Sequence, residues 1–394
     1  MRTVYTRVAI ATVLGAVLGL GAGCESPKFN PKGTYRIAGV RVTGKLLNDG
    51  WEAYTMYCAA CHGEHGDGNG VAAAGYHPPP RNFTKGIFKF AGVNGAGKLP
   101  SDADLDRIIR YGLNGTPMLP WDIPEYERRA IIQYIKTLAP LPDPKKMHDK
   151  GYKAPQSPWY AKNKKQEPLF VPASKDPYEV GGEAKALEIG KLVYHTKAQC
   201  LGCHPSYLTT EEYGSFLKKG LEIGFLTPGS TLSPREDAYN PQGKDSVDYK
   251  SRLLPPDFTR HPVRSVRVHC PSAARGLCPD SQRLEDFYRI IANGIPGTAM
   301  PSWQKQLKPD ELWALTHYVK WLHDKQLPGG DARAFRDNLL AQPPYVAPEP
   351  PPAPAPVPPV GDVAPGTEPG TEPGAAAPEA SPAPAVSPAT PTQP

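Results

Sequence analysis

The chain has 394 residues, with 45 Lys and Arg against 39 Asp and Glu, and a formal net charge of +6. This length predicts about two domains. The basic residues lack the interleaved aromatic side chains that favour nucleic-acid binding, so we expect no nucleic-acid partner. After the first two dozen residues, no stretch has the roughly 18 apolar residues that a membrane-spanning helix needs.

The amino terminus has the pattern of a secretory signal. Arg2 and Arg7 are followed by an apolar run over residues 8–20 and then by small residues. A charged start, an apolar centre and a small-residue cleavage site are typical of exported proteins. The pattern predicts a signal peptide over residues 1–23.

Cys24 follows this segment, at the position where bacterial lipoproteins are cleaved and lipidated. Gly21 stands where such signals usually have Leu. We expect Cys24 to carry a lipid that anchors the chain on the periplasmic side of a bacterial membrane, with residues 24–45 as an N-terminal tether. A cleaved signal that leaves a free thiol, or an uncleaved anchor helix, is the alternative.

A five-residue pattern, Cys-x-x-Cys-His, occurs at residues 58–62 and again at residues 200–204. It is the attachment sequence of c-type haem, in which two thiols bond one porphyrin and the His binds its iron. A redox-active cysteine pair or half of a zinc site is the alternative, but neither stretch has the accompanying residues. The pattern predicts two covalent haems, held by Cys58, Cys61 and His62 and by Cys200, Cys203 and His204.

Further landmarks repeat in the same order after each haem motif. Residues 79–84, Pro-Pro-Arg-Asn-Phe-Thr, correspond to residues 255–259, Pro-Pro-Asp-Phe-Thr. Residues 108–118 correspond to residues 290–300, and a Trp stands three residues after the Met that closes each of these stretches. The order of landmarks indicates that one domain has been duplicated.

Three helices are predicted in each copy from apolar residues at helical spacing. The first runs into the haem motif, at residues 49–56 and 184–196. The middle helix of the first copy begins at Ser101, a capping residue, and ends at Gly112. The last helix of the second copy opens at Pro309. We expect the apolar stripes to form the cores.

Met118 and Met300 each follow a Gly-Thr-x stretch and stand beside proline. A helix does not continue through such a stretch, so each Met is expected on irregular chain that wraps over the haem. A thioether favours Fe(II), and His/Met ligation raises the reduction potential. Met118 and Met300 are therefore the predicted second iron ligands, with His65 and His77 as rivals in the first copy.

Both copies resemble class I cytochrome c domains. The resemblance implies a mainly α fold of two tandem class I cytochrome c-like helical domains, over residues 46–140 and 182–326, joined by a Pro/Lys-rich linker over residues 141–181. It also implies a prolyl carbonyl that accepts the ring N–H of the iron-binding His. Pro80 and Pro255 best match that proline.

The second domain carries extra chain. Its His-to-Met spacing is 96 residues against 56 in the first, which places an insertion of 40 residues within about 205–281. Cys270 and Cys278 lie in it and are predicted to form a disulfide, with free thiols or a redox switch as alternatives. The C-terminal extension, residues 327–394, ends in a Pro/Ala-rich tail that we expect to be disordered.

These features predict a periplasmic di-haem c-type cytochrome that transfers single electrons between respiratory partners. No catalytic residue is predicted and the protein is not expected to be an enzyme, because a His/Met pair leaves no open iron position. Its expected partners are redox proteins or a membrane respiratory complex. A di-haem peroxidase and a gas-sensing haem-binding module are the alternatives, and both require a haem with one open side.

Overall fold

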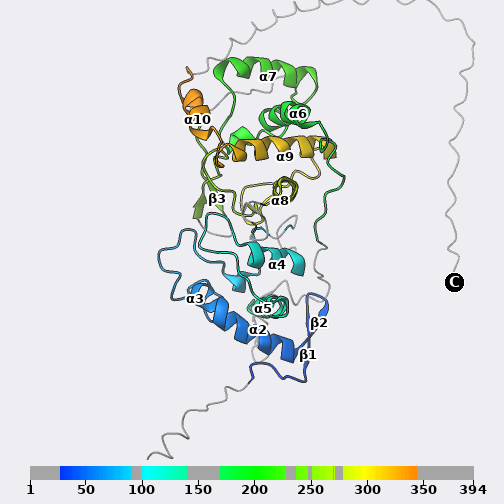
Figure 1. Cartoon of the computed structure of the whole chain (residues 1–394), viewed down its shortest axis with the longest axis vertical. Helices are drawn as coiled ribbons and strands as arrows, with labels where there is room; N and C mark the ends of the chain where they lie inside the picture. The colour runs from blue at the N-terminus through cyan, green and yellow to red at the C-terminus, as the bar shows by residue number, and fades with distance from the viewer. Residues whose placement is uncertain are drawn as a thin grey trace, which may run out of the picture. The chain divides into compact units, whose positions relative to one another are not determined.

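The computed structural model describes residues 27–90, 92, 99–139, 169–227, 237–246, 251–268, 270 and 278–343. Within these ranges the chain forms two helical domains, each with a hydrophobic core of its own (Figure 1). No helix of the described residues is long and apolar enough to cross a membrane. The predicted signal peptide, Cys24, most of the linker and the Pro/Ala-rich tail lie outside the described residues.

Domain 1 opens with a two-stranded antiparallel hairpin, which the helical pattern did not predict. Its helices follow in the predicted order. The elements are β1 (Thr34–Ile37), β2 (Val40–Thr43), α2 (Gly44–Tyr57), α3 (Ala59–His62), η1 (Phe83–Lys85), α4 (Asp102–Tyr111) and α5 (Glu125–Thr137).

Domain 2 repeats the helical plan and adds elements to it. The elements are α6 (Glu183–His195), η3 (Cys200–Gly202), α7 (Thr210–Glu222), β3 (Lys244–Ser246), β4 (Ser251–Leu253), α8 (Asp280–Asn293), α9 (Pro309–Asp324) and α10 (Ala332–Leu340). The helix α7 and the antiparallel pair β3–β4 lie in the insertion, and α10 lies in the C-terminal extension. The predicted mainly α fold is confirmed.

Local capping sets the helix ends that the sequence marks. The hydroxyl of Ser101 accepts a hydrogen bond from the Asp104 amide at 3.1 Å and so begins α4 as predicted. α9 begins at Pro309, also as predicted. α2 begins earlier than its predicted start, because Thr43 caps it by accepting from the Leu46 amide.

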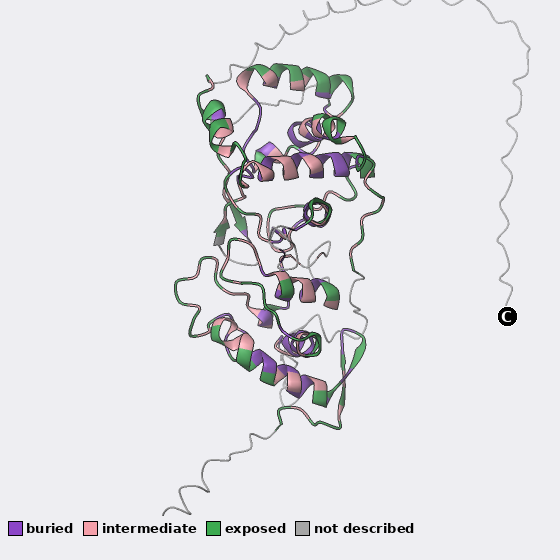
Figure 2. Cartoon of the chain, in the orientation of Figure 1, coloured by how far each residue is buried: buried purple, intermediate pink, exposed green. Residues whose placement is uncertain are grey.

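The first and last helices of each domain cross at a glycine. A Cβ atom on Gly50 would lie 2.2 Å from the Ala130 carbonyl oxygen, and one on Gly190 would lie 2.0 Å from the Ala314 carbonyl oxygen. Only glycine permits so close an approach. Buried residues gather where α2 lies against α5 and where α6 lies against α9 (Figure 2).

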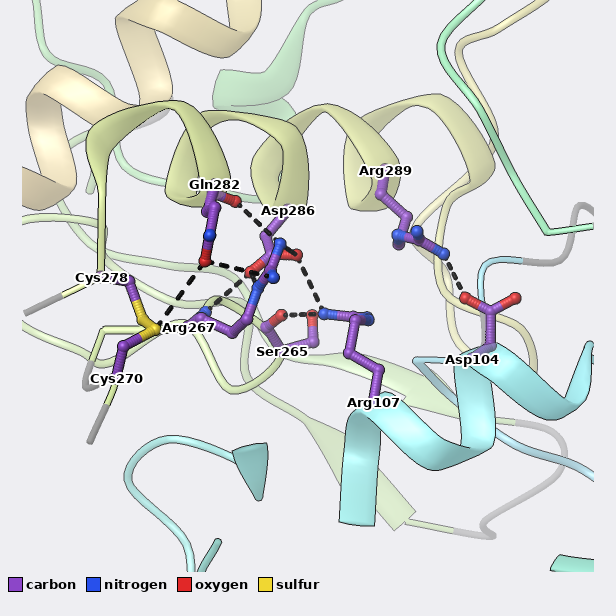
Figure 3. Close-up of polar contacts among 9 residues, drawn as sticks. All are labelled: Asp104, Arg107, Ser265, Arg267, Cys270, Cys278, Gln282, Asp286 and Arg289. Carbon is purple, nitrogen blue, oxygen red and sulfur yellow. Dashed lines mark hydrogen bonds and ion pairs between the residues drawn. A yellow bond between two sulfur atoms is a disulfide. The ribbon is translucent and has the colours of Figure 1, made fainter. Parts of the chain in front are cut away.

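The two domains exchange ion pairs between α4 and α8 (Figure 3). Arg107 Nη1 lies 3.0 Å from Asp286 Oδ1, and Arg289 Nη1 pairs with Asp104 Oδ1. Asp104 and Arg107 occupy the same positions in the first copy as Asp286 and Arg289 in the second. Such an exchange is typical of a two-fold symmetric interface between subunits, found here within one chain.

Residues 264–267, within the insertion, add further contacts between the domains. Arg267 donates to Asp286 Oδ2 at 2.8 Å, and Arg107 also donates to the Ser265 carbonyl at 3.2 Å (Figure 3). The Asn114 amide, in the loop that carries Met118, donates to the Arg264 carbonyl at 2.7 Å. The insertion of domain 2 therefore braces a loop of domain 1.

Candidate haem-attachment sites

Both Cys-x-x-Cys-His stretches fold into the same tight turn. The Cys58 carbonyl accepts from the amides of Cys61 at 3.2 Å and His62 at 2.9 Å. The Cys200 carbonyl accepts in the same way from the amides of Cys203, at 3.1 Å, and of His204, at 2.9 Å. The two thiols and the imidazole of each motif therefore project from a single turn of chain.

Each His of the motif is held by a backbone carbonyl. His62 Nδ1 lies 3.0 Å from the Arg81 carbonyl oxygen, and His204 Nδ1 lies 2.9 Å from that of Pro256. Burial lowers the pKa of His62. A neutral ring that donates from Nδ1 keeps a lone pair on Nε2, which is the form that binds a metal ion.

The expected carbonyls were wrong by one residue in each domain. Arg81 and Pro256 supply the acceptors, where Pro80 and Pro255 were predicted. A backbone acceptor can belong to any residue type, and adjacent prolines make the position ambiguous in the sequence. The fold of the turn decides which carbonyl faces the His. In each domain it belongs to the residue two before a Phe, which is Phe83 in domain 1 and Phe258 in domain 2.

A phenylalanine packs on each iron-binding candidate, and sequence reasoning missed both. The rings of His62 and Phe83 stack with centroids 4.5 Å apart, and those of His204 and Phe258 with centroids 4.6 Å apart. The shared Phe-Thr in the two repeated Pro-rich stretches was the available signal. Each Phe restricts the rotation of the imidazole that it covers.

The two Met loops have the same backbone bonds. Met118 and Met300 each donate an amide to the hydroxyl of the Thr two residues earlier, at 3.1 Å in both cases. The Met118 carbonyl accepts from the Leu113 amide at 2.8 Å, and the Met300 carbonyl from the Ile295 amide at 3.2 Å. The prediction that each Met lies on irregular chain is confirmed, and both Met residues are partly buried.

A left-handed glycine opens each of these loops. Gly112 and Gly294 have φ angles of 64° and 68°, and a Cβ at Gly112 would lie 2.5 Å from the Met118 carbonyl oxygen. Glycine adopts a positive φ angle without strain, and its lack of a Cβ atom leaves room for the nearby carbonyl oxygen. The loop that carries each Met thus turns back on itself directly after its helix.

The thiols do not have the environment of a redox-active pair. Burial, with the neighbouring thiol adding to it, raises the pKa of Cys58 and of Cys200 to about 12. Cysteines that exchange disulfides have lowered pKa values, because the thiolate is the reactive form. The raised pKa values of Cys58 and Cys200 therefore do not favour disulfide exchange.

The remaining candidate residues are also placed. His65 and His77, the rival ligands, are exposed, and Met56 has an exposed fraction of 73%. The predicted disulfide between Cys270 and Cys278 is present, with Cα atoms 4.8 Å apart.

A protein-family model for cytochrome c oxidase, cbb3-type, subunit III, matches residues 45–135 and 264–319. The fold is that of cytochrome c. The matched ranges include the first haem motif and both Met loops, while the second haem motif lies between them. No curated protein matches the chain.

Among solved structures, the chain is similar to a chain of the Kuenenia stuttgartiensis reducing HAO-like protein complex. The sequence identity is 26%, and the similarity covers 70% of this chain and 95% of that chain, with a TM-score of 0.44.

Cytochrome c domains carry covalently bound haem c and transfer electrons through it. The donor sets described above fit that group, since each combines two thiols with an imidazole that a backbone carbonyl holds through Nδ1. Cytochromes of the matched type are typically extracytoplasmic, which agrees with the predicted secretory signal.

Proposed function

We propose that the protein is a di-haem cytochrome c that relays single electrons between redox partners on the periplasmic side of a bacterial membrane, held there by a lipid on Cys24. One observation carries the proposal. Two separate places in the chain fold the same haem motif, the same carbonyl bond to its His and the same Met loop. A duplicated set of ligands supports two haem sites of one kind.

The chain's own residues have distinct parts in each site. The thiols attach the haem and the His and Met bind its iron, which supplies one-electron oxidation and reduction. The carbonyls of Arg81 and Pro256 orient the imidazoles, and the Met loops bring a second ligand. The ligands are Cys58, Cys61, His62 and Met118 in domain 1, and Cys200, Cys203, His204 and Met300 in domain 2.

The contact between the domains supports a relay within the chain. Buried aspartates on α4 and α8 pair with arginines of the opposite domain. Both pairs are shielded from water, so each resists separation more than a surface pair does. Two haem domains held together in this way would keep their cofactors within one chain at a limited range of distances, which favours electron transfer between them.

The proposal is tested first by counting haems. Mature protein, denatured and analysed by mass spectrometry and by a pyridine haemochrome assay, is expected to retain two haem equivalents per chain. One equivalent would contradict the assignment of one of the two haem sites, and none would contradict the whole proposal. Two low-spin haems in the absorption and resonance Raman spectra would distinguish the relay from the peroxidase and the gas sensor, because each of these needs a haem with an open side.

The second test addresses the Met ligands. Met118→Ala and Met300→Ala are each expected to lower the potential of one haem and to let that haem bind carbon monoxide, because loss of the thioether opens the iron. Spectroelectrochemistry and carbon monoxide difference spectra measure the two effects. Met56→Ala, at an exposed Met beside the first haem motif, is the control and should change neither. If no carbon monoxide binds to either variant, the ligand assignment is wrong.

A further inference from the structure

A buried carboxylate follows the carbonyl that holds His204. Asp257 is 1% exposed and comes directly after Pro256. Its Oδ1 accepts from the Tyr207 hydroxyl at 3.1 Å and from the Thr259 amide and hydroxyl at 3.0 and 2.7 Å. Its Oδ2 accepts from Arg336 Nη1. The turn that presents the Pro256 carbonyl is therefore built around one ionised side chain.

Arg336 reaches this site from outside the matched family region. It lies on α10, in the C-terminal extension, while the family match ends at residue 319. Phe335 stacks with Tyr207 at 6.4 Å, and the Thr210 hydroxyl donates to the Pro343 carbonyl at 2.7 Å. These contacts hold α10 against domain 2, so the arginine is delivered by a packed helix and not by loose chain.

Domain 1 forms the same turn with a neutral side chain at the position of the carboxylate. Asn82 takes the place of Asp257, is only partly buried and accepts from the Thr84 amide at 2.9 Å. The Phe83 amide donates to the Gly66 carbonyl at 2.7 Å, whereas in domain 2 the Phe258 amide donates to the Tyr207 hydroxyl. The two turns have the same shape and different electrostatics.

We infer that Arg336 is a positioning residue for the second haem, acting through Asp257 on the Pro256 carbonyl and His204. The inference rests on the proposed function. Arg336 compensates a buried negative charge beside the iron-binding His, and it fixes the turn that orients the ring. An uncompensated carboxylate stabilises the oxidised, more positive haem, so the ion pair keeps the potential of the second haem higher than Asp257 alone would leave it.

The test is Arg336→Gln in the full-length holoprotein, followed by spectroelectrochemical titration. The Met300→Ala spectrum identifies the second haem, and the first haem serves as an internal reference. We expect the equilibrium constant for electron transfer from the second haem to the first to rise about tenfold. This corresponds to a change of about 59 mV in the difference between their potentials, for one electron. The exchange of the His204 ring N–H, followed by NMR, is expected to become faster because the turn loosens.

Three further variants separate charge from structure. Arg336→Lys keeps the charge and should restore most of the potential. Arg336→Gln combined with Asp257→Asn removes both charges, imitates Asn82 and should return the potential toward that of the wild type. Arg333→Gln, on an exposed residue of the same helix, should change nothing.

The reciprocal change in domain 1 completes the design. Asn82→Asp places a carboxylate there without an arginine and should lower the potential of the first haem only. If Arg336→Gln leaves both potentials unchanged, or moves them equally, while the wild type still retains two covalent haems, this inference fails and the proposed function stands. If the wild type retains fewer than two haems, the proposed function itself fails.

Discussion

The two domains share the geometry of their candidate haem-attachment sites and differ in what surrounds it. In both, one tight turn carries the thiols and the His, a carbonyl holds Nδ1, and a Thr hydroxyl holds the Met amide. Domain 2 adds an insertion and α10 around its site, and no counterpart of α10 occurs among the described residues of domain 1. The candidate haem-binding groups are the same in both domains, and the groups one layer farther out differ.

One helix position illustrates the difference. Thr55 and His195 each follow the buried Tyr of their first helix and donate to the carbonyl four residues earlier, at 2.8 and 2.7 Å. Thr55 is exposed, whereas His195 is fully buried and its Nε2 accepts from the Tyr207 amide of the insertion. The insertion thus turns a surface position into a buried, titratable one.

The largest expected effect concerns the ion pairs that the two domains exchange. Asp286→Ala would leave Arg107 and Arg267 without their carboxylate, and loss of one partner of a buried pair costs about 3–5 kcal/mol of unfolding free energy. Urea denaturation measures this loss. Asp104→Ala should cost less, because a single arginine pairs with Asp104 among the described residues.

Asp337→Ala is the control for this prediction, since Asp337 pairs with Arg333 on the exposed surface of α10. It should leave the denaturation midpoint nearly unchanged. A loss of similar size in Asp337→Ala and Asp286→Ala would show that burial of the ion pairs between the domains does not increase their contribution to the unfolding free energy.

The next effect sharpens the contrast between Thr55 and His195. Burial lowers the pKa of His195 to about 3, while an unfolded His titrates near 6.5. Between these values the unfolded chain binds a proton that the folded chain does not, so stability falls as the pH falls from 6.5 toward 3. From pH 7 to pH 4 the unfolding free energy should drop by about 3 kcal/mol through this residue.

His195→Gln should remove that part of the pH dependence, as measured by urea denaturation at pH 7, 5 and 4. Thr55→Gln, at the equivalent exposed position of domain 1, is the matched control and should retain it. An unchanged pH dependence in His195→Gln would contradict the assignment.

The smallest effect tests the asymmetric brace on the Met118 loop. Asn114→Pro removes the amide that donates to the Arg264 carbonyl, and the equivalent residue of domain 2 is already Pro296. The loss should be about 1 kcal/mol, the net contribution of one hydrogen bond. Hydrogen exchange should show a less protected Met118 loop. Asn114→Ala keeps the amide, so equal effects of the Ala and Pro variants would refute the brace.

The sequence by itself determined the features that arise within a few residues. The spacing of Cys-x-x-Cys-His, the capping Ser101, the proline that opens α9 and the Gly-Thr-x-Met loops all form through short-range bonds, so their residue types identify them. The disulfide was equally readable, because its two cysteines lie eight residues apart in a chain expected to be exported.

Only the tertiary structure decided which groups meet from distant parts of the chain. The repeated Asp-x-x-Arg was visible in both copies, but its exchange between α4 and α8 depends on how the domains pack. The carbonyls of Arg81 and Pro256 carry no side-chain signature, and Arg336 reaches Asp257 across 79 residues. Buried charges need partners, and the chain supplies those partners wherever folding brings a donor close, not where sequence order would place it.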